Sequence, residues 1–231
     1  MSSRLIKQLL EKLERKLPAV IYGGRFQPFH RGHYTVYKRL CKAFGSESVW
    51  IATSNKTNFD PAKGDVSPLT FEERKEVMVR LYDIDSDHVV QCKNPTFSPV
   101  EILNLYKGPT VCIMVVGSKD LDRYRSSKYF ERYPTTKQGK PASFEKESPD
   151  LFAVNDEING TMYYVVSDSH VGHLSGTKVR EALIKAAEAE NDDRVKSLFK
   201  EFFGKYDETI AEMLFSKLNQ VKKPKPKGLK A

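Results

Sequence analysis

The sequence lacks long hydrophobic runs. No stretch of its 231 residues approaches the roughly 20 apolar residues that a membrane-spanning helix needs, and the first ten residues contain no apolar signal-peptide core. Hydrophobic residues make up 39% of the chain and aromatic residues 11%, as in soluble globular proteins. We therefore expect a cytoplasmic protein with no membrane partner.

Cysteine is scarce. Cys41, Cys92 and Cys112 form no C-x-x-C pair and lie within apolar segments. A disulfide framework needs paired cysteines in an oxidising compartment, and a zinc site needs clustered ligands. We therefore expect reduced core cysteines and no metal site built from protein ligands.

No G-x-G-x-x-G string follows a predicted strand, which argues against a nicotinamide-dependent dehydrogenase. Positive charge is in excess, at a formal net +8, but five of the last ten residues are lysines. Much of the excess therefore belongs to a tail, residues 222–231, which we expect to be disordered. This tail could bind polyanions, so a non-catalytic nucleic-acid-binding protein stays open as one alternative, although nucleic acid is not required by the rest of the chain.

Apolar segments alternate with amphipathic ones along the chain. The pattern predicts strands over residues 19–21, 48–54, 88–92, 111–116 and 162–167, with helices between them. Such alternation indicates an α/β protein with a Rossmann-like, doubly wound parallel sheet of about five strands. Ligands of these sheets lie at the carboxyl ends of the strands, where the winding reverses.

We place this domain at residues 18–190, after a helix predicted over residues 1–17 and before a helical pair over residues 191–221. Residues 118–160 are polar, irregular and longer than an ordinary connection, which indicates either a functional lid or a flexible insert. Asn159-Gly160 predicts a hairpin-type turn before the last strand.

Residues 22–33 read Y-G-G-R-F-Q-P-F-H-R-G-H and stand between the first strand and a helix that we expect to begin near His33. Two glycines allow the backbone to come close to another group, and His30 and His33 stand beside the helix N-terminus. Exposed N–H groups and the positive dipole end make this an anion site. Arg25 and Arg31 add positive charge, so the string predicts a phosphate cradle.

Two other helix starts have the spacing of capping boxes. Thr70 with Glu73, and Ser98 with Glu101, each place a carboxylate in the first turn, where the helix dipole favours it.

The helix predicted to begin after Ser175 is different, because Lys178 and Arg180 lie near its start. Cations at a helix N-terminus are unfavourable by roughly 0.3–1 kcal/mol each, and a bound anion reverses that sign. Because this helix start faces the predicted crevice, its unfavourable cations indicate a functional site.

Residues 24–33 resemble the H-x-G-H signature of the nucleotidylyltransferase superfamily, most closely its archaeal-type nicotinamide mononucleotide adenylyltransferases. Residues 175–180 resemble the second signature of that family, S-[ST]-T-x-x-R, with Gly176 as a departure that removes one possible hydroxyl contact. Residues 68–74 resemble its P-F-T-x-x-E-R-type motif, and the alternative there is a capped helix with a solvated arginine.

The resemblance implies a Rossmann-like domain that catalyses adenylyl transfer, with Mg²⁺ bridging the phosphates of the nucleotide. His30 and His33 would contact the α- and β-phosphates, Ser175 and Thr177 the β- and γ-phosphates, and Arg180 would neutralise pyrophosphate. The residues expected to bind nucleotide are Gly23, Gly24, Arg25, Phe26, Gly117, Ser118, Asp120, Ser175, Gly176 and Thr177, and those expected to bind the acceptor are Arg74 and Lys119.

The substrate is less determined. The resemblance favours ATP and nicotinamide mononucleotide, but no tryptophan follows the third strand, where that branch has an aromatic residue for the nicotinamide ring. CTP-using relatives share both signatures, so a cytidylyltransferase acting on another phosphomonoester stays open. A class I aminoacyl-tRNA synthetase is disfavoured by the short chain and by the lack of a K-M-S-K-S-like string. Oligomerisation is possible.

A second H-x-G-H string at residues 170–173 is a rival to the first. It lacks the preceding Gly-Arg-Phe context, and no helix follows it directly. We interpret it as a loop beside the nucleotide whose likeness to the signature is coincidental, and we do not expect it to bind metal.

Overall fold

The computed structural model describes residues 17–106, 110–134, 153–154, 158–159, 162–166, 174–189 and 191–221. Residues 1–16, the second H-x-G-H string and the lysine tail lie outside this part, so the expectations for them stay predictions.

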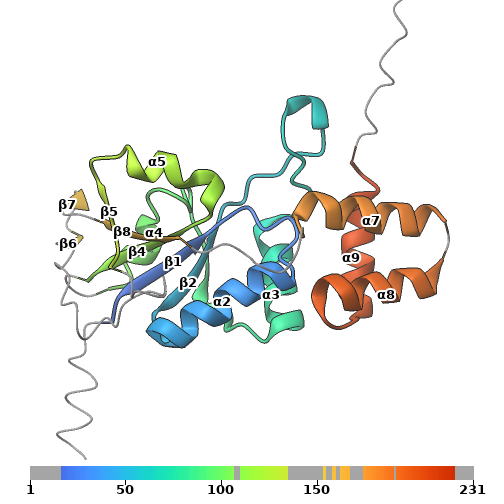
Figure 1. The fold of residues 1–231 in the computed structure, drawn as a ribbon. Helices are drawn as coiled ribbons and strands as arrows, with labels where there is room; N and C mark the ends of the chain where they lie inside the picture. Colours follow the sequence, from blue (N-terminus) through green and yellow to red (C-terminus); the bar gives the residue numbers. More distant parts are fainter. Residues whose placement is uncertain are drawn as a thin grey trace, which may run out of the picture.

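A six-stranded, fully parallel sheet forms the centre of the molecule (Figure 1). Its order is β3-β2-β1-β4-β8-β5. The strands are β1 (Ala19–Gly23), β2 (Val49–Thr53), β3 (Val89–Gln91), β4 (Cys112–Val116), β5 (Phe130–Arg132) and β8 (Met162–Val166). Central strands such as β4 are buried along their whole length, which explains their continuous apolar sequences.

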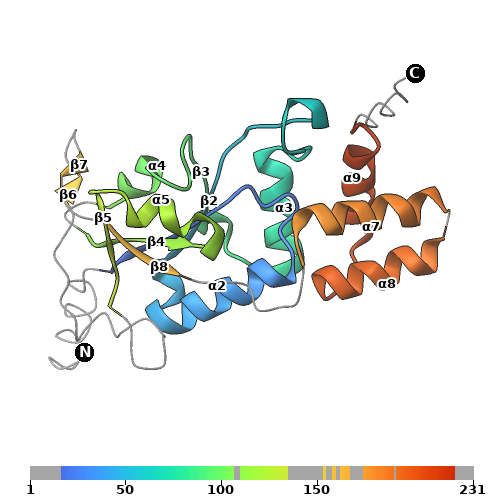
Figure 2. The same ribbon diagram turned by 45° about the horizontal axis from the view of Figure 1, so that its top comes forward.

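Helices cover both faces of the sheet and one end of it (Figures 1 and 2). The helices are α2 (Arg31–Phe44), α3 (Phe71–Tyr82), α4 (Val100–Leu103), α5 (Leu121–Arg125), α7 (Gly176–Glu188), α8 (Asp192–Phe203) and α9 (Glu208–Leu218). Apolar side chains of α2 pack with Val20 and Ile113 on one face, while those of α4 and α5 pack with Ile21 and Met114 on the other. The fold is therefore the expected Rossmann-like α/β fold with a doubly wound sheet, followed by the helical pair α8 and α9.

The insert contributes a strand that the sequence did not predict. β5 lies within residues 118–160 and pairs parallel with β8 at the edge of the sheet, so the sheet has six strands rather than about five. Phe130 is the only apolar residue of β5 and the other two are exposed charged residues, which is why the apolar pattern missed it. Asn159 lies in β7 (Ile158–Asn159), antiparallel to β6 (Ala153–Val154), and Gly160 lies outside the described residues.

One predicted capping box is wrong. The N-cap of α4 is Pro99, which makes no side-chain cap, and Glu101 Oε1 instead accepts a hydrogen bond from the Lys93 N–H at 2.8 Å. The helix consequently spans only four residues. The box at α3 is confirmed, because Thr70 Oγ1 accepts from the Glu73 N–H and Glu73 Oε2 accepts from the Thr70 N–H.

Cys92 and Cys112 are buried and Cys41 is half-buried, all three as free thiols. Among the described helices, none has the length and apolar character needed to cross a membrane.

Candidate functional site

The segment after β1 leaves the sheet where its winding reverses. Strands β1, β2 and β3 are added in one direction and β4 lies on the other side of β1, so the switch falls between β1 and β4. The carboxyl ends of these two parallel strands share an edge. Gly117 and η4 (Ser118–Asp120), which includes Lys119, follow β4 at this edge and are exposed to solvent.

Helix α2 begins at Arg31, two residues before the expected start, and both histidines form its cap. His30 is the N-cap, and its Nδ1 accepts a hydrogen bond from the Gly32 N–H at 3.1 Å. His33 Nδ1 accepts in return from the His30 N–H at 3.3 Å. The sequence prediction placed the start too late because it rested on the helical spacing of apolar residues, which begins only at Tyr37.

This cap fixes the hydrogen-bonding role of both imidazoles. Since each Nδ1 is an acceptor, the proton of each neutral ring is assigned to Nε2. Burial lowers the pKa of His30 to about 4, and burial and the neighbouring His30 ring lower the pKa of His33 well below its ordinary value. Both rings are therefore neutral near pH 7, and each offers one Nε2–H donor.

The donor of His30 has no partner in the part of the chain that the structure describes. His30 is 1% exposed, and its Nε2 is buried without a hydrogen bond. The two rings stack with centroids 3.8 Å apart, so both are held side by side. A buried donor left without a partner costs free energy unless a ligand supplies an acceptor.

Aromatic side chains surround His33. The ring centroids of Phe26, Phe29 and Tyr22 lie 5.1, 5.3 and 6.4 Å from that of His33. Phe26 adopts a left-handed backbone conformation at φ 45°, which is uncommon for a bulky residue and occurs mainly where packing holds it. These rings cover His33 in part, since it stays half-buried, and this desolvation together with the burial of His30 is the physical cause of the lowered histidine pKa values.

The start of α7 meets the same loop. Ser175 is the N-cap as predicted, and its Oγ accepts from the Lys178 N–H at 3.3 Å. Arg180 Nη1 donates to the Gln27 carbonyl, and its Nη2 donates to Thr177 Oγ1 at 3.2 Å. The two signatures, about 150 residues apart, are thus brought into contact.

The close approach explains Gly176. A Cβ at this position would lie 2.7 Å from the Gln27 carbonyl oxygen, which is backbone and cannot move aside cheaply. The glycine at position 176 is therefore required by packing. At the other end of the loop, a Cβ on Gly23 would lie 2.1 Å from the Pro95 carbonyl oxygen, in the segment after β3.

Two arginines give the loop region positive charge. Arg25 is exposed and pairs with the equally exposed Asp65 at 2.6 Å. Burial and the nearby Arg25 lower the pKa of Arg180, so the two guanidinium groups lie close enough to repel each other. Arg31 was expected to add positive charge to the phosphate cradle. Its Nη1 instead donates to the Glu201 carbonyl of α8 at 3.4 Å.

Arg74 lies beneath the loop rather than at its surface. It is 1% exposed, and its guanidinium donates to four protein oxygens. This burial does not favour the contact with an acceptor phosphate that the sequence suggested, and a solvated arginine is excluded as well.

Sequence reasoning missed Gln27. Its side-chain amide makes two hydrogen bonds of 2.9 Å with the backbone of Leu69, ahead of α3, and its carbonyl accepts from Arg180. All three contacts are long-range, so no local pattern points to them.

The site offers few ligands for a metal. Among the described residues, no group of three histidine, cysteine or acidic side chains could hold a metal ion. The donor set at the loop consists of imidazole and guanidinium N–H groups and backbone, which suits an anion. A Mg²⁺ ion coordinated mainly by phosphates fits this set better than one held by protein.

Comparisons with known proteins place these features in a family. The profile described as Cytidylyltransferase-like matches residues 21–182. No curated protein matches the chain significantly.

Several solved structures are similar. Nicotinic acid mononucleotide adenylyltransferase of Plasmodium falciparum, complexed with NaAD, is 12% identical, with a TM-score of 0.46 over 85% of this chain and 94% of that chain. Its complex with APC gives the same identity and coverage and a TM-score of 0.45. A bifunctional NMN adenylyltransferase/ADP ribose pyrophosphatase from Francisella tularensis is 18% identical, with a TM-score of 0.42 over 88% of this chain and 53% of that chain.

The family match runs from β1 into α7 and so includes both strings that meet at the loop. It covers well over half of the 231 residues. The chain therefore belongs to the Cytidylyltransferase-like family of nucleotidyltransferases.

Proposed function

We propose that the protein transfers a nucleoside monophosphate from a nucleoside triphosphate to a phosphate-monoester acceptor and releases pyrophosphate. AMP is the favoured group and nicotinamide mononucleotide the leading acceptor. The observation that carries the proposal is the meeting of two neutral Nε2–H donors, one of them buried without a partner, with the Arg180 guanidinium at one loop.

The chemistry needs position and charge stabilisation rather than a protein nucleophile. An acceptor phosphate oxygen attacks the α-phosphorus, the bond to the oxygen that bridges the α- and β-phosphates breaks, and pyrophosphate leaves with the electron pair. Fixed donors aimed at the phosphate oxygens stabilise the charge that develops. His30 and His33 supply such donors without changing protonation, because their low pKa values keep them neutral.

The start of α7 has the groups to hold the leaving pyrophosphate. Ser175 and Thr177 offer hydroxyl and backbone N–H groups, and the helix dipole favours an anion there. Arg180 and Arg25 add positive charge at this place. Mg²⁺ bound to the phosphates would further neutralise the triphosphate.

The most direct test combines nucleoside triphosphates with acceptors and measures pyrophosphate. ATP and CTP are each assayed with nicotinamide mononucleotide, phosphopantetheine, flavin mononucleotide, and sugar and polyol phosphates. We expect pyrophosphate release only when an acceptor is present, with ATP and nicotinamide mononucleotide the best pair. A preference for CTP would favour the cytidylyltransferase alternative.

Absence of turnover across this panel would favour a non-catalytic binding protein. Deleting residues 222–231 distinguishes a transferase from a nucleic-acid-binding protein. A transferase keeps its turnover without the lysine tail, whereas a nucleic-acid binder that depends on the tail loses its affinity.

A further inference from the structure

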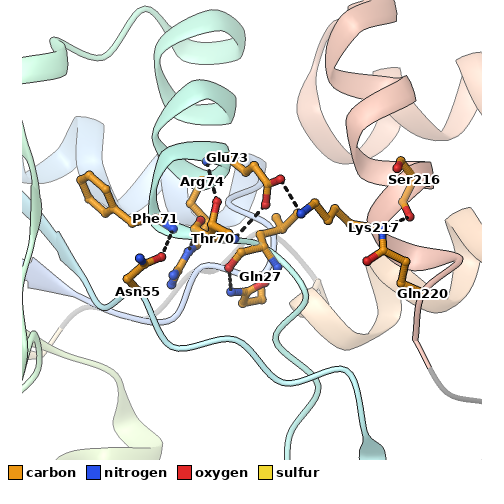
Figure 3. Close-up of polar contacts among 10 residues, drawn as sticks. Gln27, Asn55, Thr70, Phe71, Glu73, Arg74, Ser216, Lys217 and Gln220 are labelled. Atoms are coloured by element: carbon orange, nitrogen blue, oxygen red, sulfur yellow. Dashed lines mark hydrogen bonds and ion pairs between the residues drawn. The ribbon is translucent and has the colours of Figure 1, made fainter.

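Arg74 is a buried cation, and no carboxylate of the described residues lies at hydrogen-bond distance from it. Its Nε donates to the Thr70 carbonyl at 2.9 Å, its Nη1 to the Arg25 carbonyl at 2.9 Å and to Thr53 Oγ1 at 2.7 Å, and its Nη2 to the Ser54 carbonyl. The adjacent carboxylate of Glu73 is used elsewhere. It accepts from the Thr70 N–H and pairs with Lys217 at 2.8 Å (Figure 3).

The four acceptors come from the loop after β1 and from two segments that border it. Arg25 lies in the loop, Thr53 ends β2 and is followed by Ser54, and Thr70 is the N-cap of α3. A planar guanidinium can bond all of these acceptors in one fixed geometry, whereas a lysine ammonium has only three rotatable donors. Arg74 thus holds three backbone segments in register beneath the site.

The loop is short between this anchor and the histidines. Arg74 fixes Arg25 from below, Gln27 is fixed by Leu69, and His30, three residues later, is the N-cap of α2. Phe26 follows Arg25 directly and its ring centroid lies 5.1 Å from that of His33, so a shift of the backbone at Arg25 would pass through Phe26 to the stacked imidazoles. A misplacement of about 1 Å in a reacting group can cost a factor of ~10² in rate.

We propose that Arg74 is a positioning residue for nucleotidyl transfer, which fixes the backbone at Arg25 and thereby the direction of the imidazole donors. This inference rests on the proposed function for its kinetic part. Its structural part, that Arg74 orders the loop, is independent of any reaction.

The experiment compares Arg74→Lys with a matched control, Arg80→Lys. Arg80 lies on the same helix and bonds both carboxylate oxygens of Asp207, at 2.9 and 3.1 Å, away from the loop. Both variants keep the positive charge and replace the planar guanidinium group with an ammonium group. kcat and the KM for the triphosphate are measured well below the lower melting temperature, and hydrogen exchange is measured over residues 23–29.

For Arg74→Lys we expect kcat to fall by ~10- to 10²-fold, with the KM for the triphosphate within about threefold of the wild type, because α7 still binds phosphate. The amides of residues 23–29 should exchange faster. Arg80→Lys should lower the melting temperature yet keep kcat and the exchange of the loop.

Two results would overturn the proposal: wild-type kcat and loop exchange in Arg74→Lys, or an equal fall of kcat in Arg80→Lys. If the wild type itself shows no turnover with any substrate pair, the proposed function fails. Hydrogen exchange then decides the role of Arg74, since unchanged exchange in Arg74→Lys would overturn it and faster exchange limited to that variant would support it.

Discussion

At the scale of residues, the loop after β1 ends in two histidines that stay neutral near pH 7. His30 and His33 each use Nδ1 to accept a backbone N–H, and aromatic rings cover His33 in part. A neutral Nε2–H donor can stabilise a phosphate oxygen without taking or giving a proton. The rate should therefore show no inflection from these histidines near pH 6.5.

The same burial predicts how stability depends on pH. His30 has a pKa of about 4 when folded and about 6.5 when unfolded, so below pH 6.5 the unfolded chain binds more protons. The contribution of neutral His30 to the free energy of unfolding is fully present above pH 6.5 and is lost as pH falls towards 4. The loss is at most about 1.4 kcal/mol per pH unit for each such histidine.

Denaturant unfolding of the wild type and of His30→Asn at pH 7 and pH 5 measures this loss of stability. Asparagine is a good N-cap and does not titrate, so the variant should lose less stability between the two pH values. A variant that loses as much as the wild type would show that His30 is not held neutral by burial.

At the scale of elements, the start of α7 is fitted to the loop after β1. In an exposed helix, Gly→Ala stabilises by about 1 kcal/mol. At Gly176 the added Cβ would meet the Gln27 carbonyl oxygen at 2.7 Å. The two elements would have to move apart, and with them the contact of Arg180 with the loop.

We expect Gly176→Ala to destabilise the protein by ~1–3 kcal/mol and to weaken triphosphate binding. Lys178→Ala, an exposed change in the same turn, is the control and should leave stability almost unchanged. Thermal unfolding and titration with the magnesium complex of ATP measure both effects. A Gly176→Ala protein as stable as the wild type would contradict the close approach.

Much at this scale could be predicted from the sequence. Apolar runs located all five expected strands, which are β1, β2, β3, β4 and β8, and the capping signals at Thr70 and Ser175 located the starts of α3 and α7. The remainder depends on distant partners. Glu101 bonds Lys93 instead of a helix start, β5 has a single apolar residue, and Arg74 is buried by segments that are distant in the sequence.

At the scale of the whole molecule, the C-terminal helices share a core with the site. Apolar residues of α3, α7, α8 and α9 form one buried cluster with Phe26 and Phe29 of the loop. Polar contacts join the same elements, since Lys217 of α9 pairs with Glu73 and Arg80 of α3 pairs with Asp207. The helical pair therefore supports the wall behind the histidines.

This packing makes Phe199 of α8 a test of the shared core. Phe199 is 0% exposed and lies against Phe203, Tyr206 and Phe215. Phe199→Ala should lower the free energy of unfolding by ~3–5 kcal/mol, whereas exposed Lys200→Ala should change it by less than about 0.5 kcal/mol. Urea unfolding followed by far-UV circular dichroism distinguishes them. Equal, small effects would mean that α8 is not part of the core.

The central claim is that the first H-x-G-H string, and not the second, carries the transfer. The most direct measurement is the rate of pyrophosphate release by the wild type, His33→Ala and His173→Ala at saturating substrates. Removing one preorganised donor should lower kcat by ~10²–10³ in His33→Ala, and His173→Ala should cost much less. Equal losses, or a larger loss in His173→Ala, would contradict the account.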